Sequence, residues 1–174
     1  MESQTALLVI DVQEGMFVPE YPVSQGDFLL DKIEGLIAKA RSSQVPIIYI
    51  QHNEEPGEQL VPHSEAWQIQ SRISPEEGDV VVQKLKPDGF HETDLQVKLE
   101  LLGIRKLVIT GIQTDMCVNA TSKRASQLGY DVIIVEDAHT TYDQDSKTAS
   151  KIIKEYNDQF RSFANVSLAD SVIF

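Results

Sequence analysis

The chain has 174 residues, a length that fits one domain spanning residues 1–174. Its 41% hydrophobic and 24% charged residues are typical of a folded globular protein, which excludes disordered and collagen-like classes. Fifteen lysines and arginines against 27 aspartates and glutamates give a net charge of −12, which repels nucleic acid and anionic membrane surfaces. We therefore expect neither nucleic acid nor a membrane as a partner.

The N-terminal segment and the cysteine content both predict the cytoplasm as the compartment. Residues Met1–Thr5 contain no basic stretch, and the apolar run after them ends at Asp11, too soon for a signal sequence or a membrane span. The single cysteine, Cys117, cannot form an intrachain disulfide. A reducing compartment would keep this thiol free.

The first part of the chain predicts one βαβ unit. Ala6–Ile10 is a continuous apolar run, as in a strand that is buried on both faces. Asp27–Ser43 has apolar residues at steps of three and four, which predicts an amphipathic helix. Pro46 then blocks further helix before a second apolar strand, Ile47–Ile50. This order requires a right-handed crossover between parallel strands.

A long loop is expected over residues 52–78, because prolines and glycines interrupt it. We expect a short helical piece within it, over Ala66–Ile69, and a third strand after it, over Asp79–Gln83. Thr93 and Gln96 fit a capping box that opens the next helix. The inner face of that helix is expected to hold Leu95, Leu99 and Leu102, with Gly103 closing it.

The rest of the chain repeats the alternation of strands and helices. The expected elements are a strand at Leu107–Thr110, a helix at Asp115–Leu128 closed by Gly129, a strand at Val132–Val135, a loop through Tyr142, a helix at Asp145–Phe160 and a short strand at Asn165–Leu168. The pattern predicts a doubly wound, Rossmann-like α/β fold, a three-layer sandwich in which helices cover both faces of a mainly parallel sheet.

Three reactive side chains follow predicted strands. Asp11 comes directly after the first strand, Lys84 directly after the third, and Cys117 lies just beyond the fourth, at the start of a helix. Ligands of open parallel sheets bind outside the carboxyl ends of the strands, so the three groups are expected to meet there. The helix N-terminus and Lys84 would lower the pKa of the thiol, and Asp11 would exchange protons with both groups. This set predicts a cysteine nucleophile with an acid–base partner.

Each of these residues also has a purely structural interpretation. A lone cysteine is most often a small buried hydrophobic residue, an aspartate after a strand often caps a loop, and an isolated lysine after a strand is usually a solvated surface group. The usual histidine partner of a cysteine nucleophile is not evident, because His52, His63, His91 and His139 are scattered over predicted loops. The sequence also lacks the glycine-rich G-x-G-x-x-G and P-loop motifs and the G-x-S-x-G elbow.

Four motifs together resemble one known family. They are residues 8–13 (LVIDVQ), the segment from Lys84 through Phe90 to Thr93-Asp94-Leu95, residues 111–118 (GIQTDMCV), and Asp137-Ala138. The chain resembles the isochorismatase-like cysteine hydrolases, which include nicotinamidases, N-carbamoylsarcosine amidohydrolase and isochorismatase. The resemblance covers nearly the whole chain.

The resemblance implies a site and a mechanism. It implies a catalytic triad of Asp11, Lys84 and Cys117, a non-proline cis peptide between Ile112 and Gln113, and an oxyanion hole formed by the amides of Gln113 and Cys117. Asp11 would take the thiol proton, and Cys117 would attack a carbonyl or carbamoyl carbon to give a thioester that water hydrolyses. It also implies a homo-oligomer, either a dimer or a tetramer.

The sequence departs from two subgroups of this family. Nicotinamidases carry an Asp-x-His metal motif after the second strand, where this chain reads Gln51-His52-Asn53-Glu54-Glu55. His52, Glu54, Glu55 and His63 are zinc-ligand types without a fixed spacing, so we expect no metal or other cofactor. Isochorismatase proper hydrolyses a vinyl ether without a cysteine at the nucleophile position. Cys117 therefore favours hydrolysis of a C–N bond in a small amide, carbamoyl or ureido compound.

Two further expectations complete the prediction. We expect a substrate pocket lined by Gln13 and by five aromatic residues, namely Phe17, Tyr21, Trp67, Phe90 and Tyr142. Gln13 could also orient Asp11 or simply bond to backbone. The alternative to an enzyme is a catalytically silent binding or scaffold protein with the same fold. Retention of an aspartate, a lysine and a cysteine at all three chemical positions argues against that alternative.

Overall fold

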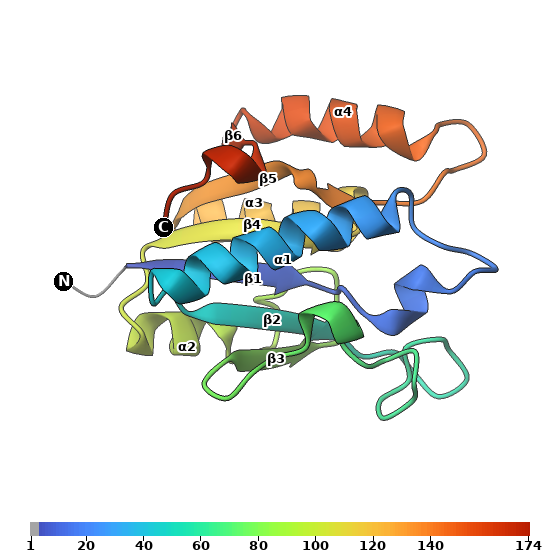
Figure 1. Ribbon diagram of the computed structural model, residues 1–174, viewed down its shortest axis with the longest axis horizontal. Coiled ribbons are helices and arrows are strands. Elements are labelled where there is room, and N and C mark those ends of the chain that lie inside the picture. Colours follow the sequence, from blue (N-terminus) through green and yellow to red (C-terminus); the bar gives the residue numbers. More distant parts are fainter. Residues whose placement is uncertain (1–3) are drawn as a thin grey trace.

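Parallel strands form one sheet in the order β3-β2-β1-β4-β5-β6 (Figure 1). The computed structural model describes residues 4–174, so residues 1–3 of the segment examined above for a targeting signal lie outside the described residues. The strands are β1 (Thr5–Ile10), β2 (Ile47–His52), β3 (Val80–Lys84), β4 (Lys106–Ile112), β5 (Asp131–Thr140) and β6 (Asn165–Ser167).

Helices cover both faces of the sheet. Figure 1 shows α1 (Gly26–Ser42) in front of the sheet, and the residues it buries pack with those of η1 (Glu14–Phe17), η2 (Ser71–Ile73) and η4 (Ala169–Ser171). The opposite face packs against α2 (Leu95–Leu101), α3 (Asn119–Gln127) and α4 (Ala149–Phe160). The predicted doubly wound, three-layer α/β fold is confirmed. Within residues 4–174 no helix combines the length and apolar character needed to cross a bilayer.

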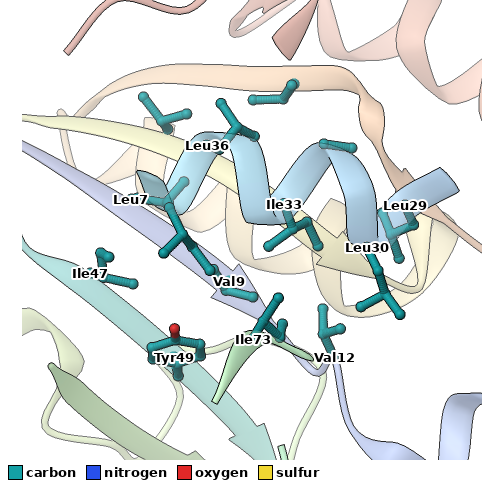
Figure 2. Packing of buried hydrophobic residues seen from close by; sticks show 14 of the residues in the cluster. Leu7, Val9, Val12, Leu29, Leu30, Ile33, Leu36, Ile47, Tyr49 and Ile73 are labelled. Atoms are coloured by element: carbon teal, nitrogen blue, oxygen red, sulfur yellow. The ribbon is translucent and has the colours of Figure 1, made fainter. Parts of the chain in front are cut away.

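The central strand β1 is apolar on both faces because the sheet is covered on both sides. Leu7 and Val9 belong to the cluster that packs under α1, and Figure 2 shows them near Ile33 and Leu36. Ala6, Leu8 and Ile10, which alternate with them along the strand, belong to the cluster on the opposite face. Burial of each large aliphatic side chain contributes about 1.5–3 kcal/mol, so the two clusters hold the strand ends rigidly in place.

The start of α2 corrects one prediction. The N-cap residue is Asp94, and it makes no side-chain capping bond. The hydroxyl of Thr93 donates to the carbonyl of Gly89 at 2.7 Å, and the Gln96 amide donates to a glutamate one turn further along the helix. The predicted capping box is therefore not formed. Leu102, expected on the inner face, lies just beyond the helix and is 42% exposed.

Three other boundaries differ from the prediction. The last helix begins at Ala149 and not at Asp145, because the Thr148 hydroxyl caps it by accepting from the Lys151 amide. Turns occupy the segment over Ala66–Ile69, and the short helical turn follows as η2. Strand β5 does not end at Val135, because a shift of register against β4 carries it on to Thr140.

Candidate active site

The carboxyl ends of four neighbouring strands carry the candidate site. The chain order reverses between β1 and β4, and open α/β sheets bind ligands at such a switch point. Asp11 directly follows β1, while His52 and Lys84 are the last residues of β2 and β3 and are paired in register. Cys117 lies in η3 (Thr114–Val118), a turn of π-helix that follows β4.

The structure brings the three predicted residues together. The Lys84 Nζ atom lies 2.8 Å from Asp11 Oδ2 and 3.3 Å from Cys117 Sγ. Lys84 is 2% exposed and Asp11 is 1% exposed, whereas Cys117 is partly exposed. Cys117 is therefore less deeply buried than the charged pair that its sulfur contacts.

Asp11 reaches the cluster through its backbone conformation. Side-chain alternation along β1 would place it on the α1 face with Leu7 and Val9. Its φ angle of 53° is in the left-handed region, which aspartate tolerates better than most residues, and it ends the alternation. The carboxylate can then reach Lys84. By alternation along β3, Lys84 lies on the same face as Val82, the face opposite α1.

The turn that carries Cys117 differs from the predicted helix over Asp115–Leu128. It begins as π-helix, and α3 itself starts only at Asn119. The carbonyl of Gln113 accepts hydrogen bonds from the amides of Met116 and Val118, both at 3.1 Å, which closes the turn around the cysteine. The Ile112–Gln113 peptide is cis, as the resemblance implied.

The protonation of the thiol corrects another expectation. Burial raises the pKa of Cys117, and the negative charge of Asp11 raises it further, while Lys84 opposes both effects. The pKa is therefore raised and not lowered as predicted, because desolvation disfavours the thiolate more than the ammonium favours it. The second carboxylate oxygen, Asp11 Oδ1, is buried and has no hydrogen-bond partner among the described residues. This oxygen is thus an acceptor that the described residues leave unused.

Strand β5 holds the first residue of the cysteine turn through a buried histidine. The Thr114 hydroxyl lies 2.7 Å from Nδ1 of His139, and His139 Nε2 lies 2.8 Å from the Asn157 carboxamide oxygen. Burial lowers the pKa of His139 to about 4, so the ring is neutral at physiological pH. Because the Asn157 oxygen can only accept, Nε2 carries the proton and Nδ1 accepts from Thr114. His139 therefore lies in a strand, contrary to the prediction of a loop position.

The next residue of the turn is held as well. Asp115 accepts hydrogen bonds from the Thr141 hydroxyl and the Gln144 amide, both at 2.7 Å. The end of β5 and the loop after it therefore orient the cysteine turn from one side.

His52 is the residue of the site that the sequence prediction missed. It ends β2, and its Nδ1 lies 2.8 Å from Lys84 Nζ. The predicted pattern of β2 stopped at Ile50, whereas continued alternation with Ile48 and Ile50 would have placed His52 on the same face. Atoms of Asp11, His52 and Cys117 that could bind a metal ion lie within 4.8 Å of one another. The Lys84 ammonium, however, contacts all three residues.

The other residues considered as zinc ligands are engaged elsewhere. The Glu54 carboxylate accepts from the Leu60 amide at 2.7 Å. The His63 ring lies 5.2 Å from the ring of Trp67, at a tilt of 56°. Among the described residues, the group of possible metal ligands around His52 contains none of Glu54, Glu55 and His63.

Gln13 bonds to the backbone of neighbouring segments. Its side chain is fully buried, and its amide nitrogen donates to the backbone carbonyls of His52 and Trp67 at 3.0 and 2.9 Å. Its oxygen accepts from the His52 amide at 2.9 Å. The backbone-bonding alternative considered from the sequence therefore holds, and Gln13 connects the end of β1 to the end of β2.

Of the predicted aromatic pocket residues, Phe17 and Tyr142 pack against the cluster under α1, whereas Phe90 packs against the cluster on the opposite face. Phe17 borders a cavity of about 620 Å³ together with Pro19 and Ala66. The Trp67 indole donates to the Asn53 side chain at 2.6 Å. In the described part of the chain, the ring contacts of Tyr142 and Phe90 are with Tyr21 and Tyr130 respectively.

The chain matches a known family in sequence and in structure. A family model described as an isochorismatase domain matches residues 5–167. The chain belongs to the isochorismatase family. Among solved structures, an isochorismatase from Pseudomonas putida KT2440 superposes with a TM-score of 0.91 at 30% identity, covering 98% of this chain and 90% of that one.

Two relatives with named activities are hydrolases. A streptothricin hydrolase from Streptomyces noursei is 36% identical over 138 residues, which are 79% of this chain and 50% of that protein. A ureidoacrylate amidohydrolase from Pseudomonas syringae pv. syringae is 26% identical over 171 residues, covering 78% of this chain and 70% of that enzyme. This member of the isochorismatase family thus spans about half the length of the streptothricin hydrolases that it matches.

Proposed function

We propose that the chain is a cysteine hydrolase that cleaves a C–N bond of a small amide, carbamoyl or ureido compound through a thioester intermediate. The observation that carries this proposal is the position of Lys84 Nζ, 2.8 Å from Asp11 Oδ2 and 3.3 Å from the sulfur of Cys117, a partly exposed residue. The names of two relatives, a streptothricin hydrolase and a ureidoacrylate amidohydrolase, support hydrolysis as the reaction class.

The first half of the proposed reaction forms the tetrahedral intermediate. As Cys117 attacks the carbonyl carbon, its proton passes to Asp11 Oδ1, and the Lys84 ammonium stabilises the negative charge on sulfur. The carbonyl oxygen becomes an oxyanion, for which we propose the backbone amides of Gln113 and Cys117 as donors. Loss of one such donor typically costs about 3 kcal/mol of transition-state stabilisation.

The second half releases the products. Asp11 returns its proton to the departing nitrogen, the C–N bond breaks, and the amine leaves while the acyl or carbamoyl group stays on sulfur. Water then attacks this group and gives its proton to Asp11, and the C–S bond breaks. The sulfur recovers its proton from Asp11 as the acid leaves, so atoms and charge balance over one turnover.

Mass spectrometry of the intact protein tests this proposal. The protein is incubated with a panel of small amides, carbamoyl compounds and ureido acids and quenched in acid. We expect release of an amine or ammonia and a mass increase on Cys117 equal to the retained half of the substrate. A folded protein without adduct or product across the panel would support the scaffold alternative. A vinyl ether is included in a parallel incubation, and product from it without an adduct would support the isochorismatase reaction instead.

Substitution of Asp11 by asparagine tests the role of Asp11 as the base separately from the role of Cys117 as the nucleophile. The raised pKa of Cys117 keeps the wild-type thiol protonated at neutral pH, so alkylation by iodoacetamide should be slow. An asparagine at this position would carry no negative charge, so Lys84 alone would act on the sulfur and the thiol pKa would fall. We expect faster alkylation of Asp11→Asn at pH 7 together with loss of turnover. Alkylation that is slower than in the wild type would contradict the assignment of Asp11 as the base.

The surroundings of the enzyme are part of the same proposal. We propose a reducing compartment, the cytoplasm, because the mechanism needs the unpaired thiol of Cys117. The net charge of −12 favours a small-molecule partner over nucleic acid or an anionic membrane. A dimer or tetramer, implied by the family resemblance, remains part of this proposal.

A further inference from the structure

The ammonium group of Lys84 has as many partners as it has protons. A lysine ammonium carries three N–H donors and no acceptor. Its partners are Asp11 Oδ2 at 2.8 Å, His52 Nδ1 at 2.8 Å and Cys117 Sγ at 3.3 Å. Because Lys84 is buried, an N–H without a partner would lose a hydrogen bond that water could not replace. His52 is the neutral nitrogen acceptor in this set.

The contact with Lys84 determines the tautomer of His52. Lysine can only donate, so Nδ1 of His52 must be unprotonated and the proton of the neutral ring must be on Nε2. Burial lowers the pKa of His52, and the Lys84 charge lowers it further, against smaller opposite effects of Asp11 and Glu54. The ring is therefore neutral at pH 7, as the hydrogen bond requires.

The backbone of His52 is held independently of its ring. Gln13 bonds both the amide and the carbonyl of this residue, and the register of β2 and β3 pairs it directly with Lys84. The next residue, Asn53, donates its amide to the Lys84 carbonyl at 2.8 Å. Nδ1 is thus presented to the ammonium from a fixed strand end, the arrangement expected of a residue that orients another one.

We propose that His52 is a positioning residue for the hydrolase reaction, which accepts one N–H of Lys84 and thereby directs the other two to Asp11 and Cys117. The inference rests on the proposed function for its kinetic consequences. Without an acceptor at this place, the ammonium would move to another partner, and its contact with sulfur, the longest of the three, would weaken. His52 would then affect the rate of chemistry more than the binding of substrate.

A pair of variants separates hydrogen bonding from packing. The Oδ1 atom of an asparagine occupies nearly the same place as histidine Nδ1, so His52→Asn keeps an acceptor, whereas His52→Leu removes it. We expect His52→Leu to lower kcat roughly 10- to 100-fold, the effect of losing one hydrogen bond to a charged group, with KM within about threefold. His52→Asn should restore most of kcat.

The pH profile gives a second readout. Protonation of His52 in acid would remove the acceptor and place a positive ring beside Lys84, in surroundings that also include Asp11, Cys117 and Glu54. The wild-type rate should therefore fall in acid as His52 gains a proton. The contribution of His52 to this acidic limb should be missing from His52→Asn, because asparagine does not titrate.

Alkylation of Cys117 tests the inference even if no substrate is turned over. Loss of the Lys84 contact should raise the thiol pKa, so iodoacetamide should react more slowly with His52→Leu than with the wild type at pH 8, and His52→Asn should react at nearly the wild-type rate. Equal rates in all three proteins, or equal impairment of both variants with equal loss of thermal stability, would overturn the inference. Failure of turnover with the expected alkylation pattern would overturn only the proposed function.

Discussion

Replacement of Cys117 by alanine should reduce kcat for any accepted amide by about 10⁴-fold or more, because no other group can form the covalent intermediate. The free energy of unfolding should change by only about 1 kcal/mol, since the side chain is small and partly exposed. Steady-state kinetics and urea denaturation of the purified variant measure the two effects.

A serine variant provides the matched control for this prediction. Cys117→Ser keeps a polar atom beside Lys84 and so preserves the packing of the cluster, but its hydroxyl is a much weaker nucleophile than a thiol. It should fold like the wild type and be nearly as inactive as the alanine variant. Full turnover by Cys117→Ala would mean that water, and not sulfur, attacks the substrate, and the thioester mechanism would have to be abandoned.

The substitution Gly111→Ala should destabilise the protein by more than about 4 kcal/mol, or prevent folding. A Cβ atom at this position would lie 2.1 Å from the Ile10 carbonyl oxygen and 2.7 Å from the Ile10 nitrogen. These are backbone atoms of the central strand, which cannot move aside without breaking the sheet. The φ angle of 133° adds a conformation that residues with a side chain rarely adopt. Thermal and urea denaturation measure the loss.

Gly35→Ala is the control for backbone entropy. Gly35 lies in α1, is exposed, and a Cβ there would have no atom within 4 Å. Alanine is the better helix former, so this variant should be up to about 1 kcal/mol more stable than the wild type. If Gly111→Ala were as stable as Gly35→Ala, then β1 and β4 would not approach as closely as described, and the placement of Asp11 relative to Cys117 would be in doubt.

Local sequence patterns predicted the positions of the strands better than the residues at which the helices begin. An apolar run such as Ala6–Ile10 has few alternatives in a folded chain, so the strands of the sheet were correctly located. The start of a helix depends on which of several partners a polar side chain finds. The hydroxyl of Thr93 donates to the Gly89 carbonyl, and Thr148 caps the last helix three residues after the predicted start. Such competition is decided by the path of the loop.

The amino-acid sequence by itself determined the alternating strands and helices, the family, and the three reactive residues at the strand ends. The elements and the strand ends follow from periodicity and from the rule that parallel strands present their carboxyl ends at one edge, whereas the family follows from the resemblance of the four motifs. Only the tertiary structure decided that Asp11 turns toward Lys84, that His52 completes the set of acceptors, and that the pKa of Cys117 is raised. The physical reason is that desolvation and hydrogen-bond geometry depend on atoms from distant segments, whose separations no local pattern contains.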